Sequence, residues 1–480
     1  MKKYFLFFIF FTTIYGLYSE NNIETIKLDN LINILKKESN ELILSKIYVE
    51  ISENKVYQTK SMFDVMINNY IAGTGKKNYS ELSSTKIDYT GGFETGFNFT
   101  STLPSGTQIL LGSEYEQLYS WGNIKPPSGT IEDFNSVTYD PTIKIKISQP
   151  FIYNYFGFLD RYAKKDATNS LNIEKLKYNV AEKNLVCQYT LKYYQWISYK
   201  LILEKLKLVI ENSSELEKQT LRKMKSKLLD EDDYQKSVYS VIKYRTLYNN
   251  YLSEYDNITN EIKTALKIEN NIEPDINELD FKYNEFLNLE IAKGDFSETI
   301  TGQIVSLTKK NLDYQKDIFY NKTLPKLNLT GTMDVKFRNY YNDSSLVSDA
   351  NSYGDIDFIV GLDFSYPLGN FKAKGDYENV KLLSEKLSAE EKIMSENYDK
   401  IINKTLILNS YLRENLELKK LALDSLYLRL KTENIKFNNA NIEIRNLIET
   451  ENLILSDEIE LLNLKLVFIK NYIDYFNIIK

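Results

Sequence analysis

The chain has 480 residues and a formal net charge of −6, and it contains no histidine and a single cysteine, Cys187. The lack of histidine removes the commonest general base and metal ligand, and a single cysteine excludes disulfide frameworks and cysteine-based metal clusters. Basic and acidic residues are interspersed, so the sequence lacks the basic face of a nucleic-acid-binding protein. We therefore predict no catalysis, no cofactor, no metal site and no nucleic-acid partner.

The N-terminus has the pattern of a secretory signal. Lys2 and Lys3 precede an apolar run over residues 4–14, and small residues follow up to Ser19. The alternative, an uncleaved anchor helix, is disfavoured because the apolar run is too short to span a bilayer comfortably. We predict a signal peptide over residues 1–19 and export from the cytoplasm.

Residues 24–58 are predicted to form an N-terminal helix, because Leu28, Leu31 and Leu35 recur at helical spacing. The next segments, 62–72, 92–102, 107–119 and 138–151, are rich in β-branched and aromatic residues and are separated by Gly/Pro turns. Apolar and polar residues alternate in them, as in residues 143–147, IKIKI. Membrane barrel strands show this alternation, and so do half-buried strands of soluble sheets.

Two stretches, residues 158–273 and 376–480, contain neither glycine nor proline. We predict a long helical hairpin over 158–270, made of helices at about 158–222 and 233–270, with a polar break at 227–233. Asp230 is a candidate N-cap of the second helix. No monomeric core covers helices of this length, so they are expected to pack along neighbouring helices.

A mixed insert is predicted at 271–295, which contains Pro274 and Gly294, and a helix at 297–322. Strands follow at 324–341 and 355–368, and a second helical hairpin at 371–478 closes the chain. Its break is expected near 438–441, NNAN, where asparagine tolerates the left-handed backbone of a tight turn.

The spacing of these elements indicates an internal duplication. Pro150 and Pro367 lie 217 residues apart, and the two helical breaks, at Asp233 and Asn446, lie 213 apart. The first strands of the two halves lie about 44 residues further apart than the prolines or the helical breaks do. This difference corresponds to one extra hairpin at 92–119 in the first half. We predict structural repeats over residues 20–295 and 296–480.

With these elements in this order, the chain resembles the TolC-like outer-membrane efflux family (outer membrane factors). The resemblance is carried by the strand-to-helix junctions at 148–151, SQPF, and 365–370, SYPLGN, and by 324–327, LPKL, and 102–107, TLPSGT. The junction residues are Gln149, Pro150, Tyr366 and Pro367.

The resemblance implies a homotrimer in which each protomer gives four core strands to a shared outer-membrane barrel. The helices would continue it as a periplasmic tunnel, which closes at its tip and docks a periplasmic adaptor (membrane fusion) protein and an inner-membrane transporter. The insert at 271–295 would form an equatorial belt, and whether the extra hairpin at 92–119 joins the barrel wall is left open.

The resemblance also places gating residues at the tip of the second hairpin. Acidic residues there form a ring under three-fold symmetry that favours cations, and the matching positions are Asn446 and Glu449. Glu449 retains the acid, whereas Asn446 does not, so the ring would be thinner. The alternative for Glu449 is an ordinary solvated helix residue.

At the first hairpin, Asp230, Asp232 and Asp233 are candidates to line the same entrance. Arg222 and Arg445 are candidates to pair with such acids and hold the tip closed. The alternatives are helix capping for Asp230 and a general surface role for both arginines.

The sequence thus predicts an α+β membrane protein: a trimeric outer-membrane β-barrel continuous with a long periplasmic α-helical barrel, built from a duplicated protomer. The predicted function is the exit duct of a tripartite efflux or type I secretion system, a passive channel in contact with outer-membrane lipid. The alternative is a secreted coiled-coil structural protein or adhesin without a pore, and the cargo is left open.

Overall fold

The computed structural model describes residues 24–77, 85–124, 129–289, 291–342, 351–438 and 444–479. The predicted signal peptide at 1–19 and most of the predicted break at 438–441 lie outside these residues. The chain folds into two compact units. Unit 1 comprises Met1–Leu44, Asn179–Asp295 and Asn397–Lys480, and unit 2 comprises Ser45–Tyr178 and Phe296–Glu396.

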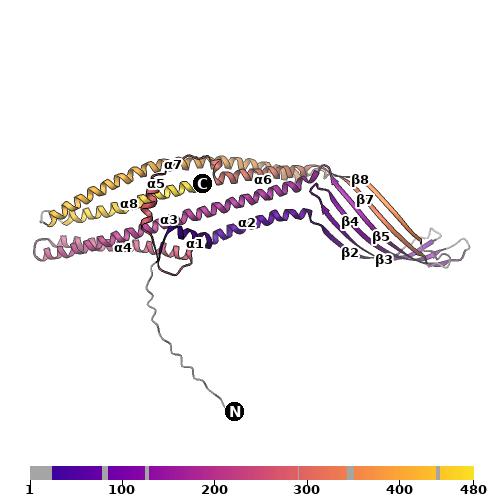
Figure 1. The fold of residues 1–480 in the computed structure, drawn as a ribbon, viewed down its shortest axis with the longest axis horizontal. Helices are drawn as coiled ribbons and strands as arrows, with labels where there is room; N and C mark the ends of the chain where they lie inside the picture. The colour runs from indigo at the N-terminus through magenta and orange to yellow at the C-terminus, as the bar shows by residue number, and fades with distance from the viewer. Residues whose placement is uncertain are drawn as a thin grey trace, which may run out of the picture. The chain divides into compact units, whose positions relative to one another are not determined.

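Four long helices form two hairpins (Figure 1). The first hairpin consists of α3 (Phe158–Lys225) and α4 (Glu231–Leu266), and the second of α7 (Phe371–Asn438) and α8 (Ile444–Ile479). Helices α3 and α7 each contain 68 residues, and α4 and α8 each contain 36. The absence of glycine and proline in these stretches allows such length, because both residues weaken or break helix interiors.

Four predicted helices have different bounds in the structure, and the first of the long ones, α3, ends at Lys225 rather than at 222. The predicted helix at 24–58 is instead β1 (Glu24–Ile26), α1 (Leu28–Glu38) and α2 (Asn40–Gln58), because β1 pairs in parallel with β6 (Ile272–Pro274) and Ser39 is extended. Helix α4 ends at Leu266 rather than at 270, since Lys267 is left-handed with φ of 57°. Helix α6 (Ile300–Thr323) begins three residues later than predicted, where Thr299 Oγ1 accepts a bond from the Gly302 N–H at 3.0 Å.

The insert at 271–295 packs onto both helical hairpins within unit 1. It contains β6 and α5 (Asn277–Leu287). On one side, the hydroxyl of Tyr193 in α3 donates to the Ile26 carbonyl of β1, the strand paired with β6, at 2.8 Å. On the other, the Phe286 ring of α5 stacks on Tyr472 of α8 with centroids 5.0 Å apart, and Tyr475 Oη donates to the Ala292 carbonyl at 2.8 Å. The insert therefore ties the two hairpins together.

Unit 2 contains a six-stranded antiparallel sheet (Figure 1). Its strands are β2 (Met66–Lys77), β3 (Thr85–Thr102), β4 (Gln108–Ile124), β5 (Glu132–Pro150), β7 (Lys326–Asn342) and β8 (Asn351–Ser365). They lie in the order β2-β3-β4-β5-β7-β8. The predicted extra hairpin at 92–119 corresponds to β3 and β4, so the sheet has six strands rather than the four that the family resemblance implies.

Several strand bounds also differ from the prediction. The first strand begins at Met66 and not at 62, because residues 59–63 form the short 3-10 helix η1 (Thr59–Phe63). The last strand spans Asn351–Ser365 rather than 355–368, and it ends before Pro367, which has no N–H to donate to a ladder.

The two strand-to-helix junctions both bind the C-terminal end of α6. After β5, Asn154 is left-handed (φ 55°), and its N–H donates to Asn321 Oδ1 of α6 at 2.9 Å. After β8, Asn370 is left-handed as well (φ 45°), and its Nδ2 donates to the Thr323 carbonyl at 3.1 Å. Asparagine tolerates this backbone better than most residues, so each strand turns into its helix within a few residues.

The first junction is also fixed to the turn between β3 and β4. Gln149 accepts a hydrogen bond from Thr107, and its Nε2 donates to the Ser105 carbonyl at 3.4 Å. Gly157 (φ 67°) lies so close to this turn that a Cβ there would stand 2.2 Å from the Pro104 carbonyl oxygen. The junction and the turn are therefore packed backbone against backbone.

Gly157→Ala is expected to destabilise the fold strongly, because it adds a backbone clash to a left-handed conformation that costs an L-residue about 1–2 kcal/mol. Gly129→Ala is the matched control, since Gly129 is also left-handed (φ 86°) but a Cβ there meets nothing within 4 Å. Thermal unfolding in detergent measures both. A fall in Tm no larger for Gly157→Ala than for Gly129→Ala would contradict the close packing.

Candidate functional site

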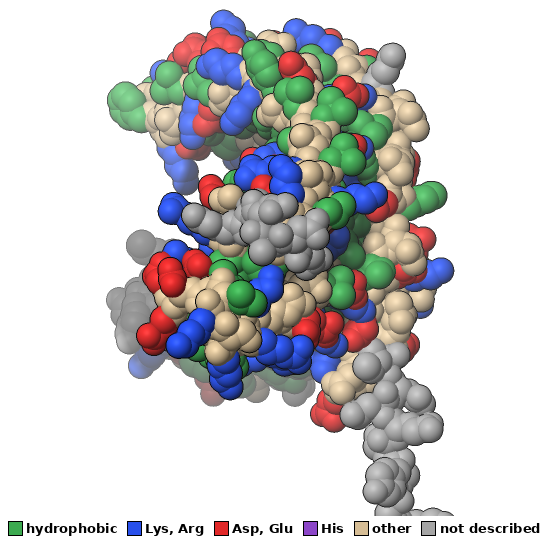
Figure 2. Space-filling model, turned by 90° about the vertical axis from the view of Figure 1, so that its left-hand side faces the viewer, with side chains coloured by type: hydrophobic (Ala, Val, Ile, Leu, Met, Phe, Trp, Pro, Cys, Tyr) green, Lys and Arg blue, Asp and Glu red, His purple; other side chains and the backbone are tan. Residues whose placement is uncertain are grey.

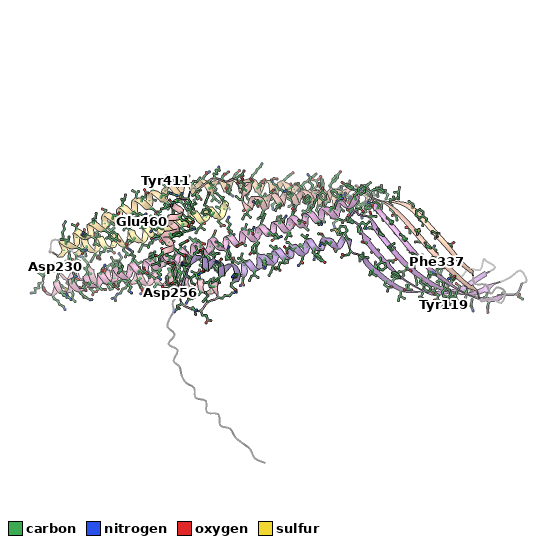
Figure 3. All side chains as sticks on the ribbon, in the orientation of Figure 1. Tyr119, Asp230, Asp256, Phe337, Tyr411 and Glu460 are labelled. Carbon is green, nitrogen blue, oxygen red and sulfur yellow. The ribbon has the colours of Figure 1, made fainter. Side chains whose placement is uncertain are left out.

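The ends of the two hairpins enclose a groove of about 770 Å³ between the first turns of α4 and α8. Figure 2 looks toward this end, where basic and acidic side chains are interspersed, and Figure 3 marks Asp230 at the end of the first hairpin. The charged residues that line the groove are Asp232, Lys236, Lys243, Arg445 and Glu449. The fold thus places three of the residues selected from the sequence on one surface, namely Asp232, Arg445 and Glu449.

The acids at the start of α4 are paired with a lysine one turn further on. Lys236 Nζ lies 2.5 Å from Asp232 Oδ2 and 3.4 Å from Asp233 Oδ1. The hydrogen bond that Lys236 donates to Asp232, together with the negative charge of Asp232, raises the pKa of Lys236, so the ammonium stays protonated. Asp232 and Asp233 also occupy the first turn of α4, where carboxylates interact favourably with the helix dipole.

The remaining predicted residues lie around the groove without lining it. Asp230 occupies the N-cap position of α4 with extended backbone, but its side chain accepts no capping hydrogen bond. The side-chain capping suggested from the sequence is therefore not observed. Asn446 is exposed in the first turn of α8, and Arg222 is exposed near the end of α3. Within the described residues, neither Arg222 nor Arg445 forms a salt bridge.

Sequence reasoning missed the polar residues that join α4 to α8 at the groove. Asn452 Oδ1 accepts hydrogen bonds from Lys243 Nζ at 2.9 Å and from Tyr244 Oη at 3.0 Å. Burial raises the pKa of Tyr244 to about 12, so it remains a hydrogen-bond donor. No local motif distinguishes these three residues, because their meeting depends on how two helices about 200 residues apart pack.

A buried carboxyl lies next to this layer. Glu451 is mostly buried in α8, and burial raises its pKa to about 7. Among the described residues, its Oε2 has no hydrogen-bond partner. Such a group is costly to ionise because the protein replaces water without replacing its hydrogen bonds.

Apolar contacts hold the ends of both hairpins together. One buried cluster joins α3 to α7 and α8 through Leu216, Phe437, Ile444 and Leu447. Lys223 Nζ of α3 lies 3.8 Å from the centroid of the Phe437 ring of α7. Within one chain the two hairpins therefore form a single packed end.

The sheet of unit 2 presents a second surface with two different faces. Apolar side chains occupy every second position of β8 and are largely exposed, for example Phe358 at 70% and Leu362 at 69%. The register continues this face across the sheet to Ile67 and Ile71 of β2, which are 67% and 79% exposed. Apolar patches of this width are rare on soluble monomers and mark surfaces that contact a protein or a membrane.

The opposite face of the sheet carries paired charges. Arg338 Nε lies 2.7 Å from Asp140 Oδ1, and Lys144 pairs with Glu114. A further pair, Lys336 with Asp357, joins β7 to β8 at 2.7 Å. This face is suited to water, whereas the first face is not.

Aromatic rings gather in β3 and β4 toward the strand ends that lie away from the turn at 103–107. Tyr89 and Trp121 have centroids 5.2 Å apart, and Tyr119 stacks on Trp121 at 6.2 Å. Figure 3 shows Tyr119 and Phe337 on the strands. Tyrosine and tryptophan are enriched where an apolar layer meets water.

Among the described helices, none has an apolar stretch of the length that crosses a bilayer. The described residues also contain no cluster of three acidic or cysteine side chains placed to hold a metal ion.

No family model matches the chain, and no curated protein matches it by sequence. Solved structures of outer-membrane channels do share its fold. CusC, whose structures concern transmembrane channel formation, is 10% identical with a TM-score of 0.65 and covers 97% of this chain and 95% of its own. The outer membrane channel CmeC of Campylobacter jejuni is 12% identical with a TM-score of 0.63, over 94% and 85% of the two chains. The outer membrane protein VceC of Vibrio cholerae is 9% identical with a TM-score of 0.63, over 94% and 95%.

The chain therefore has the fold of the TolC-like outer-membrane channels, and the resemblance stated from the sequence is confirmed at the level of the fold. Of these neighbours, CusC is described by its transmembrane channel formation and CmeC as an outer membrane channel.

Glu451→Gln is expected to stabilise the protein above pH 7 and to have little effect near pH 4. The folded-state pKa of Glu451, about 7, lies above its ordinary value of 4.5, so the folded chain holds this proton more tightly. Wild-type stability should then fall as pH rises from about 4.5 to about 7, by at most about 3 kcal/mol. Tm as a function of pH measures this, with the exposed Glu449→Gln as the matched control. A pH profile of Glu451→Gln parallel to that of the wild type would contradict the buried, unpaired carboxyl.

Proposed function

We propose that this protein is an outer-membrane exit duct of a tripartite efflux or type I secretion system. It would act as a homotrimeric, passive channel without catalysis of its own, with the sheets forming a β-barrel in the outer membrane and the helices a periplasmic tunnel. The two halves of the chain would be structural repeats, each consisting of strands followed by a helical hairpin. Energy would come from an inner-membrane transporter that reaches the duct through a periplasmic adaptor.

The amphipathic sheet is the observation that carries this proposal. A wide, exposed apolar face and a charge-paired opposite face are what a barrel wall needs between lipid and water. The strands are 12 to 19 residues long, and roughly 9–11 are enough to cross a bilayer. The alternative of a secreted coiled-coil protein or adhesin leaves this apolar face in water, which makes it the weaker reading.

The helices support assembly into a trimer. In unit 1, α7 exposes Ile407, Leu418, Leu421 and Leu428, at 56–69% of their surface. At 1.5 Å per residue, a 68-residue helix is about 100 Å long. Apolar side chains along such a length are expected to be covered by helices of a neighbouring copy.

The groove between α4 and α8 supports a gate at the hairpin ends. Three-fold symmetry would repeat Glu449 and Asp232 around one entrance and concentrate negative charge there. Opening would require the hairpin ends to separate, a rigid-body change that adaptor contacts would favour. Cargo selection would reside in the transporter, so the proposal covers both small molecules and proteins.

Imaging of the mature protein extracted from outer membranes in detergent tests the proposal. We expect a three-fold particle with a short detergent-bound end and a long hollow stalk, and a mass near three times that of the mature chain. A monomer, or a filament with no detergent-bound end, would contradict the channel and support the coiled-coil alternative.

Glu449→Gln is expected to weaken block of the channel by multivalent cations, because it removes the carboxylate that three copies would present at the entrance. The measurement is single-channel conductance with a trivalent cation added on the stalk side, and we expect the blocking concentration to rise at least several-fold. Glu269→Gln, an exposed glutamate after α4, makes the same charge change away from the groove and should leave block unchanged. Equal block in wild type and Glu449→Gln would remove Glu449 from the gate.

A further inference from the structure

We propose that the barrel wall contains six strands from each protomer, and that the β2 edge of one copy pairs with the β8 edge of the next. Three copies would then close a barrel of eighteen strands instead of the twelve that four strands per protomer would give. The inference rests on the proposed function, because it takes three copies and a membrane barrel as given. The partner at each sheet edge is a second copy of this chain.

Strands β2 and β3 belong to the same sheet as the other four. All twelve residues of β2 pair with β3, and β3 pairs with β4 from Thr102↔Gln108 out to Thr85↔Ile124. The one irregularity in β3–β4 pairing lies between Ile87 and Tyr89, near the outer end. The β2–β3 hairpin is thus hydrogen-bonded to β4, and the strands β3 and β4 of the predicted extra hairpin at 92–119 lie inside this one sheet.

The side chains of β2 follow the same two faces as the rest of the sheet. On the apolar face, Ile67 and Ile71 continue the row that includes Phe97 and Phe99 of β3. On the charged face, Tyr70 Oη lies 2.6 Å from a carboxylate oxygen of Glu94 in β3 and 2.6 Å from one of Glu114 in β4. Because Glu114 also pairs with Lys144 of β5, one polar network spans β2 to β5.

The register shows a steady stagger in one direction, as a tilted barrel requires. A row of paired residues that starts at Met66, the first residue of β2, runs through Thr100, Leu110, Lys146 and Thr332 and reaches Ile359 of β8. Strand β8 continues to Ser365, six residues beyond Ile359 toward the helices. Six strands therefore accumulate a stagger of six residues.

This stagger matches a closed eighteen-stranded barrel. If Met66 of the next copy pairs beside Ser365, each protomer adds six residues of stagger, and three protomers add eighteen for eighteen strands. The total stagger in residues then equals the number of strands. With about 3.3 Å per residue along a strand and about 4.8 Å between strands, this equality gives a strand tilt of about 35°. Outer-membrane barrels have tilts of roughly 35–45°, so this pairing of the two edges gives a strand tilt within their range.

The two edges are suited to each other. Strands β2 and β8 have 12 and 15 residues and contain no proline, which would block an edge. The register that sets Met66 beside Ser365 also sets exposed Lys76 beside exposed Asp355 on the charged face. In lipid, an unpaired edge leaves a row of unsatisfied backbone groups, so closure between copies is required.

Six strands per protomer would make the duct wide at the membrane. Barrel diameter grows roughly in proportion to strand number, so eighteen strands give a cross-section about twice that of twelve. At this width the barrel interior is an aqueous channel, as in porins with 16–18 strands. The hairpin ends, not the barrel, would then limit passage.

Cryo-electron microscopy of the full-length mature trimer in detergent tests the strand number directly. We expect eighteen strands in a three-fold barrel with β2 and β8 of neighbouring copies side by side. A three-fold barrel of twelve strands, with β2 and β3 outside the wall, would overturn this inference and leave the proposed function intact. A particle with no barrel, or a six-stranded barrel closed within one chain, would overturn both.

Disulfide cross-linking of intact cells provides an independent test in a Cys187→Ser background. Met66→Cys with Ser365→Cys places thiols on the two proposed partner edges and should give covalently linked protomers. Leu110→Cys with Ser365→Cys is the matched control, because Leu110 lies on the same paired row as Met66 but in β4. Linked protomers in the control alone would show a four-stranded wall, and linkage in neither variant would overturn the proposed register.

Discussion

The structure depends on the sheet of unit 2, which has an exposed apolar face and two long edge strands. The face and the edges each constrain the surroundings in which the sheet is stable. Exposure of the apolar face to water is unfavourable. Open strand edges are less stable in water or in lipid than edges that pair with another strand. A lipid layer satisfies the first requirement, and the edge of another copy satisfies the second. Under the proposed function, membrane insertion and assembly would both follow from the same strand pattern.

The connection from strands to helices is the second requirement of this architecture. Each junction passes through a left-handed asparagine, and both are hydrogen-bonded to the end of α6, through Asn321 and the Thr323 carbonyl. One helix end thus fixes the direction in which α3 and α7 leave the sheet. Proline alone does not explain the junctions, since Pro150 is still the last residue of β5.

At the hairpin ends, stability and opening make opposite demands. The apolar cluster around Leu216 and Phe437 packs the two hairpins together, and Lys236 partly neutralises the acids of α4. The mostly buried carboxyl of Glu451, whose Oε2 has no hydrogen-bond partner among the described residues, acts in the other direction, because it destabilises the packed state when it ionises. Under the proposed function, such a balance would suit hairpin ends that separate when the duct opens.

The sequence alone determined the long helices, the alternating strands and their order, because these follow from local patterns: no glycine or proline over about a hundred residues, and apolar residues at every second position. Only the tertiary structure decided which segments meet. The pairing of β1 with β6, the contact between Asn154 and Asn321, the joining of α4 to α8 through Asn452 and the burial of Glu451 each bring together residues far apart in the chain. Local periodicity shows which face of an element is apolar, but not which neighbour covers it, so these contacts leave no signal in a single sequence.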